Sequence, residues 1–237
     1  MNGTLRILAV AALACLFAAE IDAADDAMER RMRVCTQCHD DTGMRVRNSY
    51  YPRIAGKPEG YLFNQLVNFR DGRRFNALMT HLVEHLPDAY LREMAAYFAA
   101  RNPVHAAPQS LDLAPETLQR GRTLALHGDA SGNIPACASC HGNLLMGAMP
   151  AIPGLIGLPR DYLIAQFGSW RIGTRHALAP DCMAEITARM SPQDIAAVSA
   201  WLSTQAVPAG ATPESASRAE LPMACGSVPA PLPSAGR

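Results

Sequence analysis

Two copies of one pentapeptide are the part of this chain best suited to chemistry. Residues 35–39 read Cys-Thr-Gln-Cys-His and residues 137–141 read Cys-Ala-Ser-Cys-His. The pattern Cys-x-x-Cys-His is typical of covalent c-type haem attachment. On a helical turn, residues i and i+3 share a face, so both thiols can reach the two vinyl groups of one macrocycle. We therefore expect thioether bonds from Cys35, Cys38, Cys137 and Cys140, with His39 and His141 as proximal iron ligands.

Two other chemistries use paired cysteines and stay open as alternatives. A zinc ribbon places its Cys-x-x-Cys knuckles about 15–20 residues apart, whereas nearly 100 residues separate these two. A redox dithiol of the thioredoxin type needs a βαβ setting, and no strand pattern flanks either motif. A structural disulfide explains neither the histidine nor the repetition, whereas haem attachment accounts for both.

The repetition extends beyond the pentapeptide. Five residues of the first half recur in the second half at a constant offset of 101 positions, and four later ones recur at 104. The pairs are Pro52/Pro153, Tyr61/Tyr162, Gln65/Gln166, Phe69/Trp170 and Gly72/Gly173, then Met79/Met183, Leu86/Met190, Leu91/Ile195 and Tyr97/Trp201. A three-residue insertion in the second copy explains the change of offset. The pattern indicates a tandem duplication of a unit of roughly 80 to 100 residues.

The duplication also selects candidates for the sixth iron ligand. A methionine thioether is a soft ligand that raises the reduction potential, and the chain has 11 methionines. Met79 and Met183 are equivalent in the repeat and follow their histidines by 40 and 42 residues, so a returning loop could bring each to the opposite haem face. Either could instead fill a core. The competing ligands are Met44, His81 and His85 in the first half and Met146, Met149 and His176 in the second.

Helices are the elements that must position these residues. Apolar side chains at helical spacing predict helices over 60–70, 88–100, 161–171 and 191–204. A first helix should start after Asp25 or Asp26 and run into Cys35, with its counterpart at 115–127. Ser191 and Asp194 suit a capped helix start. The segments between are rich in Gly and Pro without polar–apolar alternation, so we predict an all-α fold.

Composition excludes several classes of protein. The 237 residues carry 21 basic and 21 acidic side chains, and 49% of the residues are hydrophobic. This composition is not that of a disordered chain, and it lacks the basic excess of a general nucleic-acid binder. Residues 1–23 match a secretory signal peptide with cleavage expected after Ala23. An uncleaved anchor and lipidation at Cys15 are the alternatives.

These residues resemble the dihaem cytochromes c of the cytochrome c4 type, which are two class I cytochrome c domains in tandem. The resemblance covers roughly residues 27–205 and rests on both haem motifs, on Tyr-x-x-x-Gln at 61–65 and 162–166, and on the later methionine. It implies two covalently bound haem c groups, one held by Cys35, Cys38, His39 and Met79 and the other by Cys137, Cys140, His141 and Met183. It implies domains at 24–106 and 107–207. A Pro/Ala-rich tail follows at 208–237, with little to bury, and we expect it to be extended or disordered.

The same resemblance implies a function. Such proteins are periplasmic electron carriers and not enzymes, because both axial positions of each haem iron are filled. Their partners are redox proteins, namely a dehydrogenase, a cytochrome complex or a terminal oxidase, through which the chain could associate with a membrane; no nucleic acid is expected. Two alternatives stay open. One is a cytochrome subunit of a sulfide or alcohol dehydrogenase complex, and the other is a haem enzyme such as a thiosulfate dehydrogenase.

Three features depart from the family pattern. Asp40 follows His39 where a glycine is usual, as Gly142 follows His141. Cys182 directly precedes Met183, and Cys225 lies in the tail. With four cysteines assigned to haem and Cys15 in the signal segment, these two remain. We predict a Cys182–Cys225 disulfide that ties the tail across the Met183 loop, with two free thiols as the alternative.

Aromatic and basic residues could surround the haems. Tyr61, Phe69, Tyr162 and Trp170 are candidates for packing near them, although packing in the helical core explains these residues at least as well. The arginines that could pair with haem propionates or form a docking face are Arg53, Arg70, Arg73, Arg74, Arg160 and Arg171. Lys57 is the only lysine, which excludes a docking surface built from a ring of lysines.

Overall fold

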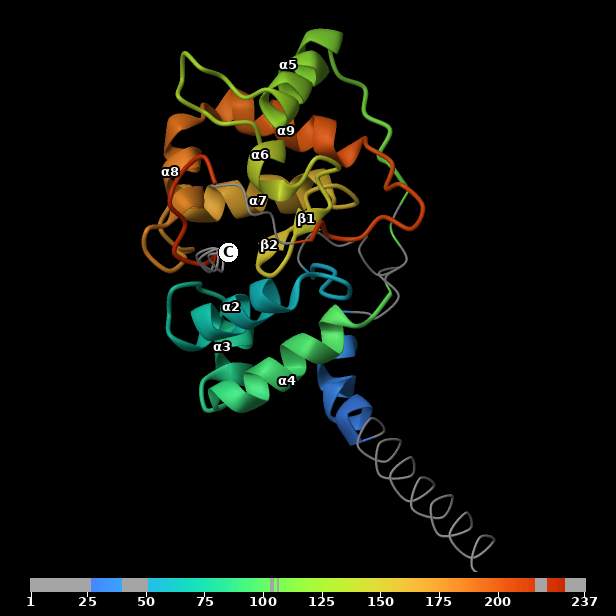
Figure 1. Cartoon of the computed structure of the whole chain (residues 1–237), viewed down its shortest axis with the longest axis vertical. Coiled ribbons are helices and arrows are strands. Elements are labelled where there is room, and N and C mark those ends of the chain that lie inside the picture. The colour runs from blue at the N-terminus through green and yellow to red at the C-terminus, as the bar shows by residue number, and fades with distance from the viewer. Residues whose placement is uncertain (1–26, 40–50, 103–104, 106, 216–220, 229–237) are drawn as a thin grey trace, which may run out of the picture. The chain divides into compact units, whose positions relative to one another are not determined.

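The computed structural model describes residues 27–39, 51–102, 105, 107–215 and 221–228 (Figure 1). Contacts divide the chain after Cys38 into two compact units. In the first unit, residues 27–36 form a helix with Cys35 near its end, as the sequence predicted. All of the elements named below belong to the second unit, and each unit is described by itself.

The described residues of the first half of the larger unit contain three helices. They are α2 (Glu59–Arg70), α3 (Ala77–Val83) and α4 (Asp88–Ala99). Helix α2 packs along α4 and against α3, and the side chains buried between them include Phe69, Val83, Leu91 and Phe98. The predictions for 60–70 and 88–100 are therefore confirmed to within one residue at each end.

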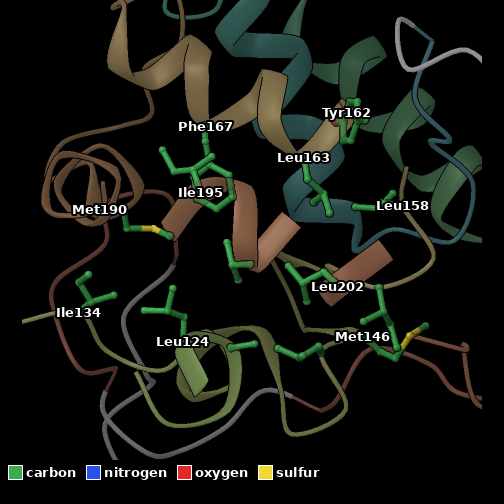
Figure 2. Packing of buried hydrophobic residues seen from close by; sticks show 14 residues of the cluster. Leu124, Ile134, Met146, Leu158, Tyr162, Leu163, Phe167, Met190, Ile195 and Leu202 are labelled. Carbon is green, nitrogen blue, oxygen red and sulfur yellow. The ribbon is translucent and has the colours of Figure 1, made fainter. Parts of the chain in front are cut away.

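The second half contains five helices in the described residues. They are α5 (Pro115–Leu126), α6 (Ala138–His141), α7 (Arg160–Arg171), α8 (Cys182–Arg189) and α9 (Pro192–Ser203). Helix α5 crosses α9, and α7 packs against both α8 and α9 (Figure 1). The core between them includes Leu124, Leu163, Phe167, Ile195 and Leu202 (Figure 2).

Local signals account for where these helices begin. Pro115 occupies the first turn of α5. Ser191 caps α9, and its side chain and that of Asp194 bond reciprocally to each other's backbone N–H groups. The only sheet among the described residues is one antiparallel pair of two-residue strands, β1 (Gly147–Ala148) and β2 (Ile152–Pro153). The all-α prediction is confirmed.

Two short helices replace the loops that we expected around the candidate methionines. Met79 lies in the first turn of α3, where its backbone N–H donates to Asn76 Oδ1 over 3.0 Å. Met183 is the second residue of α8, which Asp181 caps by accepting from the Ala184 N–H over 3.0 Å. Capping by a short polar side chain at equivalent places stabilises both turns. The sequence did not reveal them because each is too short for a periodic apolar pattern.

The C-terminal segment is also built into the fold where the structure describes it. Val207 and Ala211 pack against the core of the second half. Glu214 exchanges backbone hydrogen bonds with the β1 region, donating to Gly147 O over 2.9 Å and accepting from Met149 N over 2.8 Å. The expectation of a tail with little to bury is wrong for these residues. Residues 1–26, Asp40 and Met44 lie outside the described residues. In the part of the chain that the structure describes, no helix is long and apolar enough to cross a membrane.

Candidate haem sites

One pocket in the second half gathers all four residues that the sequence predicted for the second haem. Cys137, Cys140, His141 and Met183 line it together. Much of the remaining wall is apolar and is contributed by α5, α7, α8 and the segments between them, including Leu124, Ile134, Leu155, Leu163, Phe167, Ile186 and Met190. Two thiols, an imidazole and a thioether therefore face a common, largely apolar hollow.

A single helical turn orients the thiols and the imidazole. In α6 the backbone N–H groups of Cys140 and His141 both bond to Cys137 O, over 3.2 and 2.9 Å. His141 is 8% exposed, and its Nδ1 lies 2.7 Å from Pro153 O in β2. With Nδ1–H donated to this carbonyl, the Nε2 lone pair is left for a metal. Burial lowers the pKa of the His141 imidazole, although this hydrogen bond opposes the shift, so the ring is held neutral as coordination requires.

The thiols of the second motif are in the form that a vinyl addition needs. No disulfide joins Cys137 to Cys140. Burial raises the pKa of the Cys137 thiol to about 12 and also raises that of Cys140. Both sulfurs therefore lie in surroundings that disfavour a charge, as an apolar haem pocket requires.

The residues predicted for the first haem are divided between the two compact units. In the first unit the Cys38 N–H bonds to Cys35 O over 3.1 Å, which gives the same turn as Cys137–Cys140. In the second unit His39 Nδ1 lies 2.8 Å from Pro52 O. Because Pro52 and Pro153 are repeat partners, both histidines are oriented by the same hydrogen bond. Burial lowers the pKa of His39 as well.

Most of the competing axial ligands lie away from this pocket. The side chains of His81 and His85 are 80% and 90% exposed and lie beside Glu84. His176 is exposed and bonds through Nε2 to Gly173 O over 3.0 Å. Met146 is buried in the core cluster and Met149 is exposed, and neither is among the residues that line the pocket. Met183 is the candidate whose thioether lines the same pocket as His141.

A polar network closes one end of the pocket and joins the two halves. Arg74 bonds to Gln65 Oε1 and Gln166 Oε1 over 2.9 and 2.7 Å, and Arg175 bonds to the same two oxygens over 3.2 and 2.6 Å. Arg74 and Arg175 are separated by the repeat offset of 101 residues, as are Gln65 and Gln166. Equivalent residues of the two copies therefore bind each other reciprocally.

Buried positive charge accumulates at this end, and among the described residues no carboxylate is paired with it. Arg53, Lys57 and Arg175 are 5–6% exposed. Burial, followed by the charges of the neighbouring arginines, holds the pKa of Lys57 well below its usual value, and burial lowers that of Arg53 to about 10. Arg53 Nε is buried and has no hydrogen-bond partner among the described residues. Buried cations need an anion to offset their desolvation, and haem propionates would supply one. An apolar wall, two thiols, two axial donors and a cationic end together fit a c-type haem.

Comparison with known proteins agrees with this geometry. No family model matches the chain. The chain is 36% identical over 201 residues to a "Thiosulfate dehydrogenase electron acceptor" of Thiomonas intermedia (strain K12), covering 84% of this chain and 91% of that protein. It is 33% identical over 177 residues to "Cytochrome c4" of Pseudomonas aeruginosa, covering 73% of this chain and 85% of that protein. The chain belongs to the cytochrome c4 family. It is thus a dihaem electron-transfer cytochrome with two covalently bound haem c groups, an electron carrier and not an enzyme.

A solved cytochrome c4 has the same fold. The reduced recombinant cytochrome c4 from Pseudomonas stutzeri superposes with a TM-score of 0.64 at 26% identity, covering 76% of this chain and 97% of that one. The resemblance to this family is therefore confirmed, and the haem-enzyme alternative is not supported. Membership of this family also excludes the zinc-ribbon and redox-dithiol interpretations of the two Cys-x-x-Cys motifs.

Sequence reasoning missed two residues of this cytochrome's pocket. Arg175 was not among the candidate arginines, and Lys57 was considered only as a surface residue. The repeat offset could have identified Arg175, since it pairs with Arg74 at 101 residues. The pair also stacks on equivalent aromatic rings: the Arg175 guanidinium carbon lies 3.8 Å from the centroid of Trp170, and that of Arg74 lies 4.6 Å from Phe69. Tyr61, Tyr162 and Trp170 line the pocket, whereas Phe69 is buried in the core.

Proposed function

We propose that this cytochrome accepts electrons from a periplasmic dehydrogenase that oxidises thiosulfate and passes them to a further redox protein. The observation that carries the proposal is the relative of Thiomonas intermedia, named as an electron acceptor of thiosulfate dehydrogenase, over 91% of whose length the chain aligns. A dedicated cytochrome subunit of a sulfide or alcohol dehydrogenase complex is the second candidate.

The ligand sets proposed for the two haems follow the repeat. Cys35 and Cys38 attach the first haem, with His39 and Met79 as axial ligands. Cys137 and Cys140 attach the second, with His141 and Met183 as axial ligands. Support comes from the shared pocket of the second set and from the equivalent hydrogen bonds of the two histidines to Pro52 O and Pro153 O.

Bound haem supplies a one-electron couple between ferric and ferrous iron. The chain's own residues determine how that couple is used. Met79 and Met183 as sixth ligands would leave no free coordination position for a substrate and would raise the potential. The pocket walls are largely apolar, and the buried Lys57 and Arg175 that line the pocket would hold propionate carboxylates. Arg53 adds a buried positive charge that acts on Lys57. These are the features of a carrier that exchanges electrons without binding a reactant at iron.

A periplasmic location is proposed on two grounds. Residues 1–23 have the pattern of a signal peptide. The Cys182–Cys225 disulfide is the kind of bond that persists in an oxidising compartment. The domain boundaries proposed with it are 24–106 and 107–207, and the segment 208–237 is an addition to the second domain.

Rapid mixing tests the electron donor. The oxidised cytochrome is mixed with a purified thiosulfate dehydrogenase and thiosulfate, and the absorption of ferrous haem is followed. We expect both haems to be reduced at a rate that saturates with cytochrome concentration, whereas thiosulfate without the enzyme reduces neither. If a sulfide or alcohol dehydrogenase with its own substrate reduces the cytochrome and the thiosulfate enzyme does not, the second candidate replaces the first.

A further inference from the structure

Residues 221–228, here called the strap, form one wall of the second haem's pocket. Leu221, Met223, Cys225, Ser227 and Val228 line the pocket and are partly buried, whereas the residues at 222, 224 and 226 are exposed. The strap ends in a turn, in which the Val228 N–H donates to Cys225 O over 3.1 Å. One side of the strap therefore faces the pocket and the other faces solvent.

The strap is fastened to the short segment that leads into Met183. Its Cys225 forms a disulfide with Cys182, and the two Cα atoms are 5.0 Å apart. The Gly226 N–H donates to Pro180 O over 2.9 Å, and Ser227 Oγ accepts from the Leu178 N–H over 3.3 Å. The predicted disulfide is thus present, and it is one of three attachments along residues 178–182.

The backbone of the strap lies very close to that of residues 178–179 at Gly226. A Cβ on Gly226 would lie 2.2 Å from Ala179 O, so only a glycine fits there without a shift of backbone. On its other side the strap is bound by the first half, because Asn64 Nδ2 of α2 donates to Ser227 O over 2.9 Å. Ser227 therefore connects α2 to the segment before Met183.

Met183 lies at the start of a short helix whose first turn needs support from outside the helix. It is the second residue of α8, a helix of eight residues. Isolated helices of this length are marginal, and their first turn lacks intrahelical partners for its N–H groups. The Asp181 cap supplies one such partner. The core of the second half, against which the Met183 side chain packs, supplies further support. The disulfide at Cys182 and the hydrogen bonds at 178–180 constrain the segment that leads into this turn.

We propose that the strap is a positioning element for the second haem: through Cys225 and Ser227 it holds the Met183 thioether on the iron and closes the pocket beside it. The inference rests on the proposed ligand set, in which Met183 is the sixth ligand. It predicts that the Met183–iron bond opens more readily once the strap is released, while the first haem is unaffected.

Imidazole binding to the ferric protein measures this opening, because the probe can occupy the sixth position only after methionine has left. In the wild type we expect two kinetic phases, and the phase altered in M183A identifies the second haem. In C182A/C225A that phase should accelerate about tenfold, a change equivalent to about 1.4 kcal/mol. The other phase should stay unchanged. The control A224S changes an outward-facing strap residue and should match the wild type.

Each outcome decides one part of the claim. If M183A alters neither phase, the ligand assignment fails and the proposal fails with it. If M183A alters one phase but C182A/C225A behaves as the wild type, the strap proposal is overturned while the ligand assignment stands. Should C182A/C225A not yield folded dihaem protein, N64A leaves the disulfide intact and decides the matter. It should accelerate the second-haem phase alone, and an unchanged rate would overturn the proposal.

Discussion

The two halves of this cytochrome orient their histidines in the same way and support them differently. His39 and His141 both bond through Nδ1 to the carbonyl of a repeat-equivalent proline, over 2.8 and 2.7 Å. In the second half the C-terminal segment adds contacts near the haem motif and near Met183. Glu214 Oε1 accepts from the Asn143 N–H over 2.6 Å, just after the haem motif, and the strap lies beside Met183.

The comparison separates what belongs to the repeated unit from what was added to one copy. The orientation of the imidazole belongs to the repeated sequence, because both copies have it. The disulfide, the strap and Glu214 act on the second copy. Two haems with the same proposed ligands should therefore differ in how readily the sixth ligand leaves and in their reduction potentials.

Removing both thiols of one motif is expected to have the largest effect. Thioether bonds retain haem in an unfolded chain, so C137A/C140A should carry one covalent haem instead of two. C35A/C38A is the matched variant and should lose the other. The mass of the denatured protein gives the count. A C137A/C140A chain that still carries two haems would contradict attachment at this motif.

Crowding the α5–α9 crossing should destabilise the second half. A Cβ on Gly121 would lie 2.1 Å from Ala197 O and 2.8 Å from Trp201 Cβ. We expect G121A to lower the free energy of unfolding by about 1–3 kcal/mol. The control is G168A in α7, where nothing lies within 4 Å of the added methyl group. That change should be neutral or stabilise by up to about 1 kcal/mol. Denaturant titration compares the two, and equal midpoints would refute the steric argument.

Lys57 should affect the reduction potential of the second haem more than that of the first, because it lines the second haem's pocket. A propionate beside Lys57 would keep its ammonium group charged. Removing that charge favours ferric iron, so K57M should lower the potential of that haem by up to about 60 mV, a tenfold change in a one-electron equilibrium. K57R keeps the charge and should shift the potential less. Redox titration with resolution of the two haems measures both. A shift shared equally by the haems would contradict a local effect.

The smallest expected effect concerns an ion-pair cluster in the second half. Arg120 lies 2.8 Å from both Asp129 and Asp194. Burial alone would raise the pKa of Asp194, but hydrogen bonds from Arg120 and Ser191 hold it below its usual value. A carboxyl pKa depressed by folding stabilises the protein above the unfolded value of about 4 and loses that contribution as pH falls.

The variant R120A should therefore be less stable than the wild type by about 0.5–1 kcal/mol at pH 7. The difference should shrink below about pH 4, where Asp194 becomes protonated. Thermal unfolding at several pH values provides the measurement. A difference that is constant with pH would show that Arg120 contributes by packing alone.

The sequence predicted the features that repeat or that have a local signal. The long helices followed from apolar spacing, and the Ser191–Asp194 cap followed from two residues. The constant offset identified Pro52 and Pro153 as equivalent residues. The structure adds that the carbonyl of each lies within hydrogen-bonding distance of a histidine Nδ1. The features it missed depend on contacts between distant segments. No local pattern reports that Arg175 meets Gln65, or that Ser227 meets Asn64.

The C-terminal segment shows both a correct and a wrong prediction from the sequence. Cysteine counting predicted the Cys182–Cys225 disulfide, which the structure contains. The high Pro and Ala content predicted a segment with little to bury, yet Leu221 and Met223 line the pocket. An alternation of only a few residues is too short to be recognised as a pattern. Its role becomes clear only in the structure, where these residues line the pocket.

The weak far-red absorption band of methionine-bound ferric haem tests the central claim most directly. The claim is that both haems have His/Met ligation through Met79 and Met183. The wild type should show the band at the intensity of two such haems, and M79A and M183A should each show half of it while keeping two covalent haems. A wild-type intensity of one haem, or an M183A variant with the full band, would contradict the account.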